Sequence, residues 1–355
     1  MTETLCVDKM CDMDNSTKKR NLKIIIAVTI FVVAFSIGFI RGFRAGEPKA
    51  ITESRTRVMF DTVVRITIEG HPDLDYPRIF KEIWDELSVW EEELNLYDSS
   101  SALNIANQAD SSTVLPARLG RAVGQGLASI VPTGGTFDIR IGEMTALWDF
   151  AGEGRVPSRR EITAAFERMH RPIRMRGDTL EKEFDEPRLD LGGIAKGLAC
   201  DAVFEILDTI EGIDRFIVDL GGNIRAKSST GKSFNIGVQS PISADSVVGK
   251  FILESGRACA TAGDYQRYFV IDDVKYHHIL DPKTGMPSRK CSGVTVVAPD
   301  GATADIVSTA LFVMGPEDGM AYLDLNSEIK AVFLDSTGTI IAGDLEVSPL
   351  LDGEK

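Results

Sequence analysis

The feature that most constrains this chain is an uncharged apolar run of 17 residues, Ile24–Ile40, near the start of its 355 residues. Its length is about the shortest that can span the hydrocarbon core of a bilayer as a helix. A helix on the surface of a soluble domain would have a polar face, and this run has none. We therefore expect residues 24–40 to form a transmembrane anchor. Basic residues flank it at Lys18, Lys19, Arg20 and Lys23 on one side and at Arg41 and Arg44 on the other.

The flank that precedes the run is the more basic one, so the positive-inside rule places residues 1–23 in the cytoplasm. The rest of the chain is then expected on the periplasmic or extracellular side of the cytoplasmic membrane, held by a single span. A cleaved signal peptide is the alternative, although its charged region is usually shorter than the one found here. Because no cysteine closely follows the run, a lipoprotein anchor would have no attachment point. We favour an uncleaved anchor.

The charge of the chain is acidic, with 53 Asp and Glu against 39 Lys and Arg. This balance repels phosphate backbones, so nucleic-acid binding is not expected, and an anionic ligand would need a local cation. The cysteines are odd in number and widely scattered, which is a poor pattern for disulfides or for a metal cluster. Cys200, Cys259 and Cys291 are therefore expected to be buried as small apolar residues.

The folded part is expected over residues 58–345, with 41–57 as a linker rich in charges and 346–355 as a C-terminal tail. Periodicity predicts helices near residues 79–94, 119–130, 162–169, 195–206 and 303–314. It predicts strands near 64–69, 188–191, 216–220, 234–239, 251–253, 268–271, 274–280 and 294–297, with two more around residues 336–338. The remainder of 151–186 is expected to be a loop. This mixture of hairpins and helices favours an α+β domain with mixed, largely antiparallel sheets.

A candidate metal site lies near the C-terminus, where Asp305 and Thr309 are four residues apart. If this stretch is helical, a carboxylate and a hydroxyl project from one face, which suits two oxygen ligands of a hard cation such as Mg²⁺. Taken alone, such a pair is more typical of a solvated helix face or a cap. The segment Y-H-H-I-L-D-P-K-T-G, shortly before it, supplies His277, His278 and Asp281.

A second pattern is R-L-D-L-G-G-I-A-K-G, in which a strand-like stretch ends at Asp190, turns at Gly192 and Gly193, and continues as a helix. Glycines let the backbone approach a phosphate, and the start of a helix offers N–H donors and a partial positive charge. Lys196 in the first turn would add a point charge. The spacing matches neither a P-loop nor the dinucleotide fingerprint, and alone it is more typical of an ordinary strand-to-helix turn.

Five segments in order resemble the ApbE-type FAD:protein FMN transferases, and the similarity extends from about Val58 to Ala342. They are D-L-G-G-I-A-K-G, the L-G-G-N at 220–223, T-A-G-D-Y-Q-R-Y-F from Thr261, Y-H-H-I-L-D-P-K-T-G from Tyr276, and A-D-I-V-S-T-A-L-F-V-M-G from Ala304. The resemblance implies a T-fold-like α+β domain that cleaves FAD at its pyrophosphate, transfers FMN to a threonine hydroxyl of an exported flavoprotein, and releases AMP. Expected acceptors are flavoprotein subunits of membrane electron-transport complexes of the Nqr and Rnf type.

The resemblance also implies the roles of individual residues. Asp305 and Thr309 match the family's Mg²⁺ ligands, with the main-chain carbonyl of Gly193 as a third, and His278 matches the histidine that has a catalytic role. His277 has no role that the resemblance transfers. Contacts to FAD are expected from Met59, Tyr97, Phe137, Asp138, Asp190 and Lys196.

Three positions depart from the family pattern. Ala262 stands where a serine is usual, Asp149 stands where a glycine commonly follows the tryptophan, and Asp138 is followed by Ile-Arg-Ile-Gly in place of a proline-containing segment. These departures concern the fit around Asp138 and leave the metal pair and His278 unaffected.

Two other functions use the same residues. In an FAD pyrophosphatase, water replaces the threonine and the products are FMN and AMP. A non-catalytic flavin-binding protein at the cell surface would instead hold FAD intact in the presence of Mg²⁺. The two enzymes differ in whether an acceptor protein receives covalent flavin.

Overall fold

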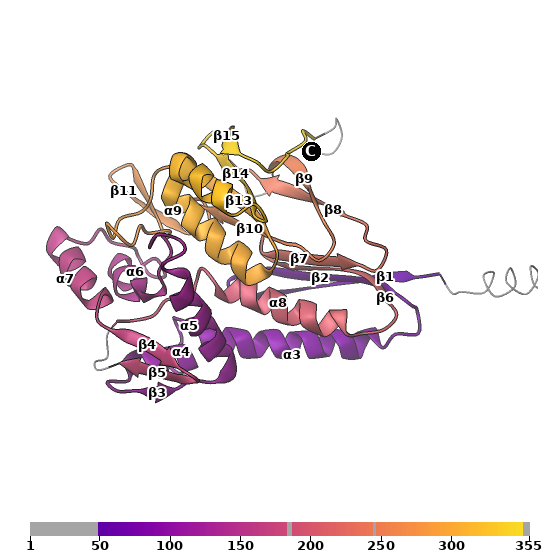
Figure 1. Cartoon of the computed structure of the whole chain (residues 1–355), viewed down its shortest axis with the longest axis horizontal. Helices are drawn as coiled ribbons and strands as arrows, with labels where there is room; N and C mark the ends of the chain where they lie inside the picture. Colours follow the sequence, from indigo (N-terminus) through magenta and orange to yellow (C-terminus); the bar gives the residue numbers. More distant parts are fainter. Residues whose placement is uncertain (1–48, 183–186, 244–245, 351–355) are drawn as a thin grey trace, which may run out of the picture. The chain divides into compact units, whose positions relative to one another are not determined.

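The computed structural model describes residues 49–182, 187–243 and 246–350 (Figure 1). The expected cytoplasmic segment at 1–23 and the expected anchor at 24–40 lie outside these residues. Within the described part, none of the helices is long and apolar enough to cross a bilayer. The α+β class is confirmed, and the domain is organised around an eight-stranded sheet in which every neighbouring pair is antiparallel.

The main sheet has the strand order β1-β2-β6-β7-β10-β13-β14-β15. Its strands are β1 (Ile51–Met59), β2 (Thr62–Gly70), β6 (Ile213–Leu220), β7 (Ile224–Ser228), β10 (Ala258–Gly263), β13 (Gly293–Ala298), β14 (Lys330–Leu334) and β15 (Ile340–Gly343).

Strand β1 shows that the expected domain boundary was wrong, because it begins at Ile51, inside the segment predicted to be a linker. It pairs with β2 along its whole length, from Ile51 opposite Gly70 to Met59 opposite Thr62. Most of its side chains are exposed on both faces, so the alternation that marks a half-buried strand is absent. The predicted tail also differs, since Ser348 forms a β-bridge with Lys250.

The strands predicted near 234–239 and 251–253 are present and pair as a hairpin, β8 (Phe234–Gln239) with β9 (Val247–Leu253). Those predicted near 268–271 and 274–280 also pair, as β11 (Tyr268–Ile271) with β12 (Val274–His277). A further small sheet has the order β3-β5-β4, from Thr113–Val114, Thr179–Lys182 and Ile173–Arg176. The expectation of a loop there was wrong, because strands of four residues are too short to show a period.

The strand predicted over Arg188–Leu191 is absent. The backbone of Leu189 bonds instead to a side chain: its N–H donates to Asn107 Oδ1 at 2.7 Å, and its carbonyl accepts from Asn107 Nδ2 at 2.9 Å. An amide side chain thus supplies the partners that a neighbouring strand would have supplied.

The helices are α3 (Tyr76–Leu94), α4 (Ala102–Gln108), α5 (Ala117–Ser129), α6 (Gly142–Trp148), α7 (Arg159–Met169), α8 (Ala195–Asp208) and α9 (Gly301–Leu325), with a 3₁₀ turn, η1, at Ile139–Ile141. Helix α9 was predicted to end at Met314. Gly315 has a non-helical backbone and precedes Pro316, so the chain is kinked there and then continues as a helix.

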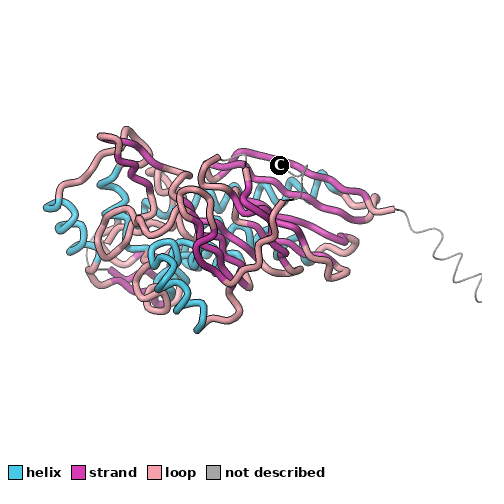
Figure 2. Tube along the Cα trace, turned by 90° about the horizontal axis from the view of Figure 1, so that it is seen from above, coloured by secondary structure: helices cyan, strands magenta, loops and turns pink. Residues whose placement is uncertain are grey.

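Helices α3, α8 and α9 cover one face of the main sheet, and Figure 2, seen from above, shows strands lying over helices. The largest hydrophobic core fills the space between them and includes Trp90, Leu198 and Phe312. A second cluster, which includes Phe234, Phe251 and Val332, packs the β8–β9 hairpin against the sheet. Cys200, Cys259 and Cys291 are buried and free, as predicted.

Helices α8 and α9 approach each other backbone to backbone at two glycines. A Cβ atom at Gly301 would lie 2.5 Å from the carbonyl oxygen of Gly197, and one at Gly197 would overlap Gly301 in the same way. Asp201 on α8 links the two helices, because its carboxylate accepts hydrogen bonds from the N–H groups of Gly301 at 2.7 Å and Ala302 at 3.0 Å. The same carboxylate pairs with Arg225 at 2.8 Å.

Candidate functional site

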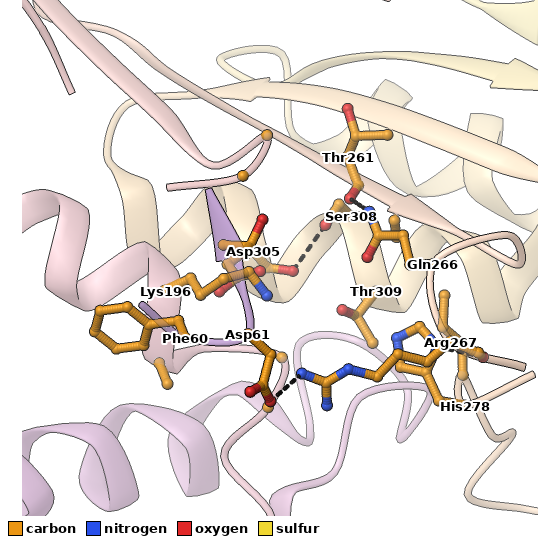
Figure 3. A pocket seen from close by; sticks show the side chains of 18 of the residues that line it. Phe60, Asp61, Lys196, Thr261, Gln266, Arg267, His278, Asp305, Ser308 and Thr309 are labelled. Atoms are coloured by element: carbon orange, nitrogen blue, oxygen red, sulfur yellow. Dashed lines mark hydrogen bonds and ion pairs between the residues drawn. The ribbon is translucent and has the colours of Figure 1, made fainter. Parts of the chain in front are cut away.

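A cavity of about 700 Å³ opens between the β1–β2 turn, the start of α8, the middle of the first part of α9 and the base of the β11–β12 hairpin (Figure 3). Nine of the ten predicted site residues line it: Tyr97, Phe137, Asp138, Asp190, Gly193, Lys196, His278, Asp305 and Thr309. Met59 is the exception, because it is buried in the hydrophobic core. Phe60 and Asp61, which follow it, line the cavity instead.

Asp305 and Thr309 project from α9 toward the start of α8. The Asp305 side chain is almost inaccessible, with 5% exposure, and its Oδ2 accepts from the N–H of Gly197 at 2.9 Å. Burial raises the pKa of Asp305, and the Lys196 ammonium opposes that rise. A Cβ atom at Gly193 would lie 3.1 Å from the Thr309 hydroxyl and 2.9 Å from the Phe137 ring. The glycine turn and the two α9 side chains are therefore neighbours.

This donor set suits a hard cation with few protein ligands. Among the described residues, no group of three or more His, Cys, Asp or Glu side chains could hold a metal ion. The candidate site would offer the carboxylate of Asp305, the hydroxyl of Thr309 and the carbonyl of Gly193, a set of oxygens that leaves room for the waters Mg²⁺ retains. The buried Asp305 carboxylate also lacks an ion-pair partner within the described part of the chain, and a cation beside it would offset the cost of burying the charge.

His278 follows β12 and is held by the backbone of Arg267. The Arg267 carbonyl lies 3.1 Å from the backbone nitrogen of His278 and 3.2 Å from its Nδ1. Because a carbonyl can only accept, Nδ1 carries the proton and Nε2 keeps a free lone pair. Burial, assisted by the charge of Arg267, lowers the pKa of His278 to about 3. The ring is therefore neutral near pH 7 and can accept a proton.

His277, the neighbouring histidine, does not line this cavity. It is buried, and its Nε2 lies 2.6 Å from the carbonyl oxygen of Ser288. Burial lowers the pKa of His277. Its ring packs edge-on against Phe312, with the ring centroids 5.5 Å apart.

Asp190 organises the glycine turn that precedes α8. Its Oδ1 accepts from the N–H of Gly192 at 2.8 Å, and its Oδ2 accepts from the hydroxyl of Thr145 at 2.9 Å. Lys196 lies in the first turn of α8, as predicted. A glycine turn that leads into a helix is therefore present here, although no strand precedes it.

Asp138 is engaged by its own neighbour. The carboxylate of Asp138 pairs with the guanidinium of Arg140 at 2.6 Å and also accepts from the N–H of Arg140 at 2.9 Å. Arg140 belongs to the segment that departs from the family pattern. The departure is thus accommodated by an internal ion pair, which occupies much of the hydrogen-bonding capacity of Asp138.

Sequence reasoning missed three charged residues that line the cavity, namely Asp61, Glu91 and Arg267. Asp61 lies in the β1–β2 turn, where both it and Phe60 have positive φ, and the guanidinium of Arg267 pairs with its carboxylate at 2.9 Å. Arg267 is part of the segment T-A-G-D-Y-Q-R-Y-F, so a signal was present. Asp61 had none, because the turn lacks the glycine that usually marks a hairpin.

Comparisons with known proteins agree with one another. The model of the ApbE family matches residues 60–333. The FAD:protein FMN transferase of Vibrio cholerae is 33% identical over 262 residues, which cover 70% of this chain and 75% of that protein. The crystal structure of the ApbE protein from Thermotoga maritima has a TM-score of 0.75 and 31% identity, covering 82% of this chain and 97% of its own. The Pseudomonas stutzeri flavinyl transferase ApbE, in its apo form, has a TM-score of 0.72 and 28% identity, covering 84% of this chain and 96% of that chain.

Proposed function

The chain belongs to the ApbE family, and from this premise we propose that it is a Mg²⁺-dependent FAD:protein FMN transferase. It moves FMN from FAD to a threonine hydroxyl of an acceptor flavoprotein and releases AMP. The observation that carries this proposal is the meeting of Asp305, Thr309, Lys196 and His278 in one cavity. The volume of about 700 Å³ lies within the range of small-molecule sites.

His278 is suited to the proton transfer that this reaction requires. The threonine oxygen forms a bond to the phosphorus of the FMN half while the bridging P–O bond breaks, and the bridging oxygen leaves with AMP. The hydroxyl proton passes to Nε2 of His278, whose ring is neutral beforehand. The bond from Nδ1 to the Arg267 carbonyl fixes the ring in the tautomer needed for this role.

The pyrophosphate is expected to lie against the start of α8. Lys196 supplies a positive charge there, and the helix N-terminus adds a partial positive charge and N–H donors. When bound, Mg²⁺ held by Asp305, Thr309 and the carbonyl of Gly193 would neutralise charge on the pyrophosphate oxygens. The remaining predicted contacts, from Tyr97, Phe137, Asp138 and Asp190, are expected to hold the rest of FAD.

We also propose a location, from the apolar run, and an acceptor class, from the family resemblance. We place the domain on the outer side of the cytoplasmic membrane, anchored by residues 24–40, with flavoprotein subunits of the Nqr and Rnf type as acceptors. The apolar run and its basic flanks support this orientation. Alkaline phosphatase fused to the C-terminus should be active in cells, because it folds only after export. An inactive phosphatase in a fusion that is expressed and inserted would reverse the orientation.

The central test uses the full chain, FAD and Mg²⁺, with and without an acceptor that carries a target threonine. The transferase should release AMP together with the appearance of covalent flavin on the acceptor. Equal AMP release without acceptor, and no flavin on it, would identify a pyrophosphatase instead. FAD that stays intact would identify a flavin-binding protein.

The metal assignment has its own test in Asp305→Ala. Turnover should be lost while some FAD binding remains, because the variant removes one cation ligand and leaves the rest of the cavity. Full activity in this variant would place the cation elsewhere.

A further inference from the structure

The cavity that would receive an anionic dinucleotide is short of positive charge. Among the described residues that line it, carboxylates outnumber cationic side chains. The cations are Lys196 and Arg267, and the carboxylates are Asp61, Glu91, Asp138, Asp190 and Asp305. The ammonium of Lys196 acts on Asp305, where it opposes the rise that burial causes in the pKa of that carboxylate. Arg267 is therefore the second cation that could contact the substrate.

Arg267 has a fixed backbone and an exchangeable side chain. Its carbonyl accepts from the backbone N–H and from Nδ1–H of His278, and these two hydrogen bonds tie the backbone of Arg267 to that histidine. Its guanidinium reaches across the mouth of the cavity to Asp61 at 2.9 Å, and Figure 3 shows it beside His278 and below Thr309. The two side chains are 41% and 72% exposed. Exposed pairs of this kind contribute little to stability, so another anion can replace one partner.

We propose that Arg267 is a phosphate-binding residue of the cavity and that Asp61 occupies its guanidinium until the dinucleotide arrives. This assignment rests on the proposed function in that it takes FAD as the substrate. The planar fork of an arginine binds two phosphate oxygens as well as it binds a carboxylate. When the guanidinium of Arg267 turns to the phosphate, the backbone carbonyl of Arg267 still accepts from Nδ1–H of His278. Substrate binding and orientation of the base are thus combined in one residue.

Asp61 is positioned by its turn and not by the ion pair. The N–H of the preceding Phe60 donates to Glu91 at 2.6 Å, which fixes the turn from the side of α3. Gly221 packs so closely against the side chain of Thr62 that a Cβ atom there would overlap it, which fixes the other side. Asparagine tolerates the positive φ that Asp61 has, so Asp61→Asn removes the charge while preserving the turn.

The two variants have opposite expected effects on FAD affinity, measured by isothermal titration of the full chain with FAD in the presence of Mg²⁺. Arg267→Ala should raise the Kd for FAD roughly tenfold, because a charge-assisted contact to phosphate is lost. Arg267→Lys should recover part of this loss, since the charge remains but the fork does not. Asp61→Asn should lower the Kd by roughly two- to fivefold, because it frees Arg267 and removes a repelling carboxylate.

Arg155→Ala is the matched control. Arg155 pairs with Glu161 at 2.9 Å, is 47% exposed and does not line the cavity, so its loss should leave the Kd unchanged. Thermal unfolding of each variant shows whether it folds. If Arg267→Ala does not fold, the affinities of Arg267→Lys and Asp61→Asn for FAD still test the assignment.

An unchanged Kd in Arg267→Ala would overturn the assignment. Weaker FAD binding in both Arg267→Ala and Asp61→Asn would also overturn it, because the ion pair itself would then be needed to maintain the shape of the cavity. If the wild-type chain fails to bind FAD, the proposed function falls and this assignment with it. Wild-type binding combined with a silent Arg267→Ala refutes the assignment alone.

Discussion

The crossing of α8 and α9 allows a test in which the structure decides the sign of the effect. In an uncrowded helix, alanine is more favourable than glycine by about 1 kcal/mol, so Gly197→Ala would ordinarily stabilise α8. Here the new Cβ would lie 2.8 Å from Cβ of Asp305, and closer still to the carbonyl of Gly301, whereas ordinary contact begins at 3.4 Å. Helix α9 would have to retreat by roughly 0.5–1 Å. We expect a net loss of about 2–3 kcal/mol in the free energy of unfolding.

Urea unfolding measures this loss, and Gly124→Ala in α5 is the control. A Cβ at Gly124 would meet nothing within 4 Å, so that variant should gain about 0.5–1 kcal/mol. The retreat of α9 would also separate Asp305 from the N–H of Gly197, so turnover should fall by roughly a hundredfold. If Gly197→Ala is as stable as the wild type, the backbone contact between the helices is not as tight as described.

Three further predictions concern stability. Asp201→Ala leaves two helix N–H groups and the guanidinium of Arg225 without their carboxylate, so urea unfolding should show a loss of about 3–5 kcal/mol, and a loss below 1 kcal/mol would contradict this account. Burial lowers the pKa of His278 to about 3, so stability is full above the ordinary pKa near 6.5 and falls as the pH drops below it. Between pH 7 and pH 5, the free energy of unfolding should fall less in His278→Gln than in the wild type. An equal fall in the two proteins would contradict the lowered pKa of His278. Asp149 ends α6 with a φ of 51°, so Asp149→Gly should raise the thermal midpoint by relieving about 1 kcal/mol of strain, and a lower midpoint would count against it.

The helices and strands that could be predicted from the sequence are those in which buried residues recur at a regular spacing along the chain. Helix α3 places its buried residues at helical spacing from Ile79 to Leu94, and strand β2 alternates buried and accessible positions. Strand β1 shows no such pattern, because it is an edge strand with both faces exposed, and its place in the sheet depends on pairing with β2. The error at Leu189 has the opposite cause. That stretch looks like a strand locally, but the side chain of Asn107 satisfies its backbone.

The site residues that were predicted are related by a local pattern in the sequence, whereas the missed ones meet only through the tertiary fold. The spacing of Asp305 and Thr309 on one helix sets their relation to each other, so a local pattern was sufficient to pair them. Gly193 joined them only through the family resemblance, because the contact with Thr309 depends on how α8 meets α9.

No local pattern could have paired Asp61 with Arg267, which are 206 residues apart. One lies in a hairpin turn without glycine, and the other lies in the loop after β10. They meet because the turn after β1 and the loop after β10 both reach the mouth of the cavity. Affinity for an anion depends on such long-range balances of charge, since each carboxylate near the phosphate weakens what a cation contributes. The motifs therefore identify the reaction class, whereas the strength of dinucleotide binding depends on a residue pair that no single motif contains.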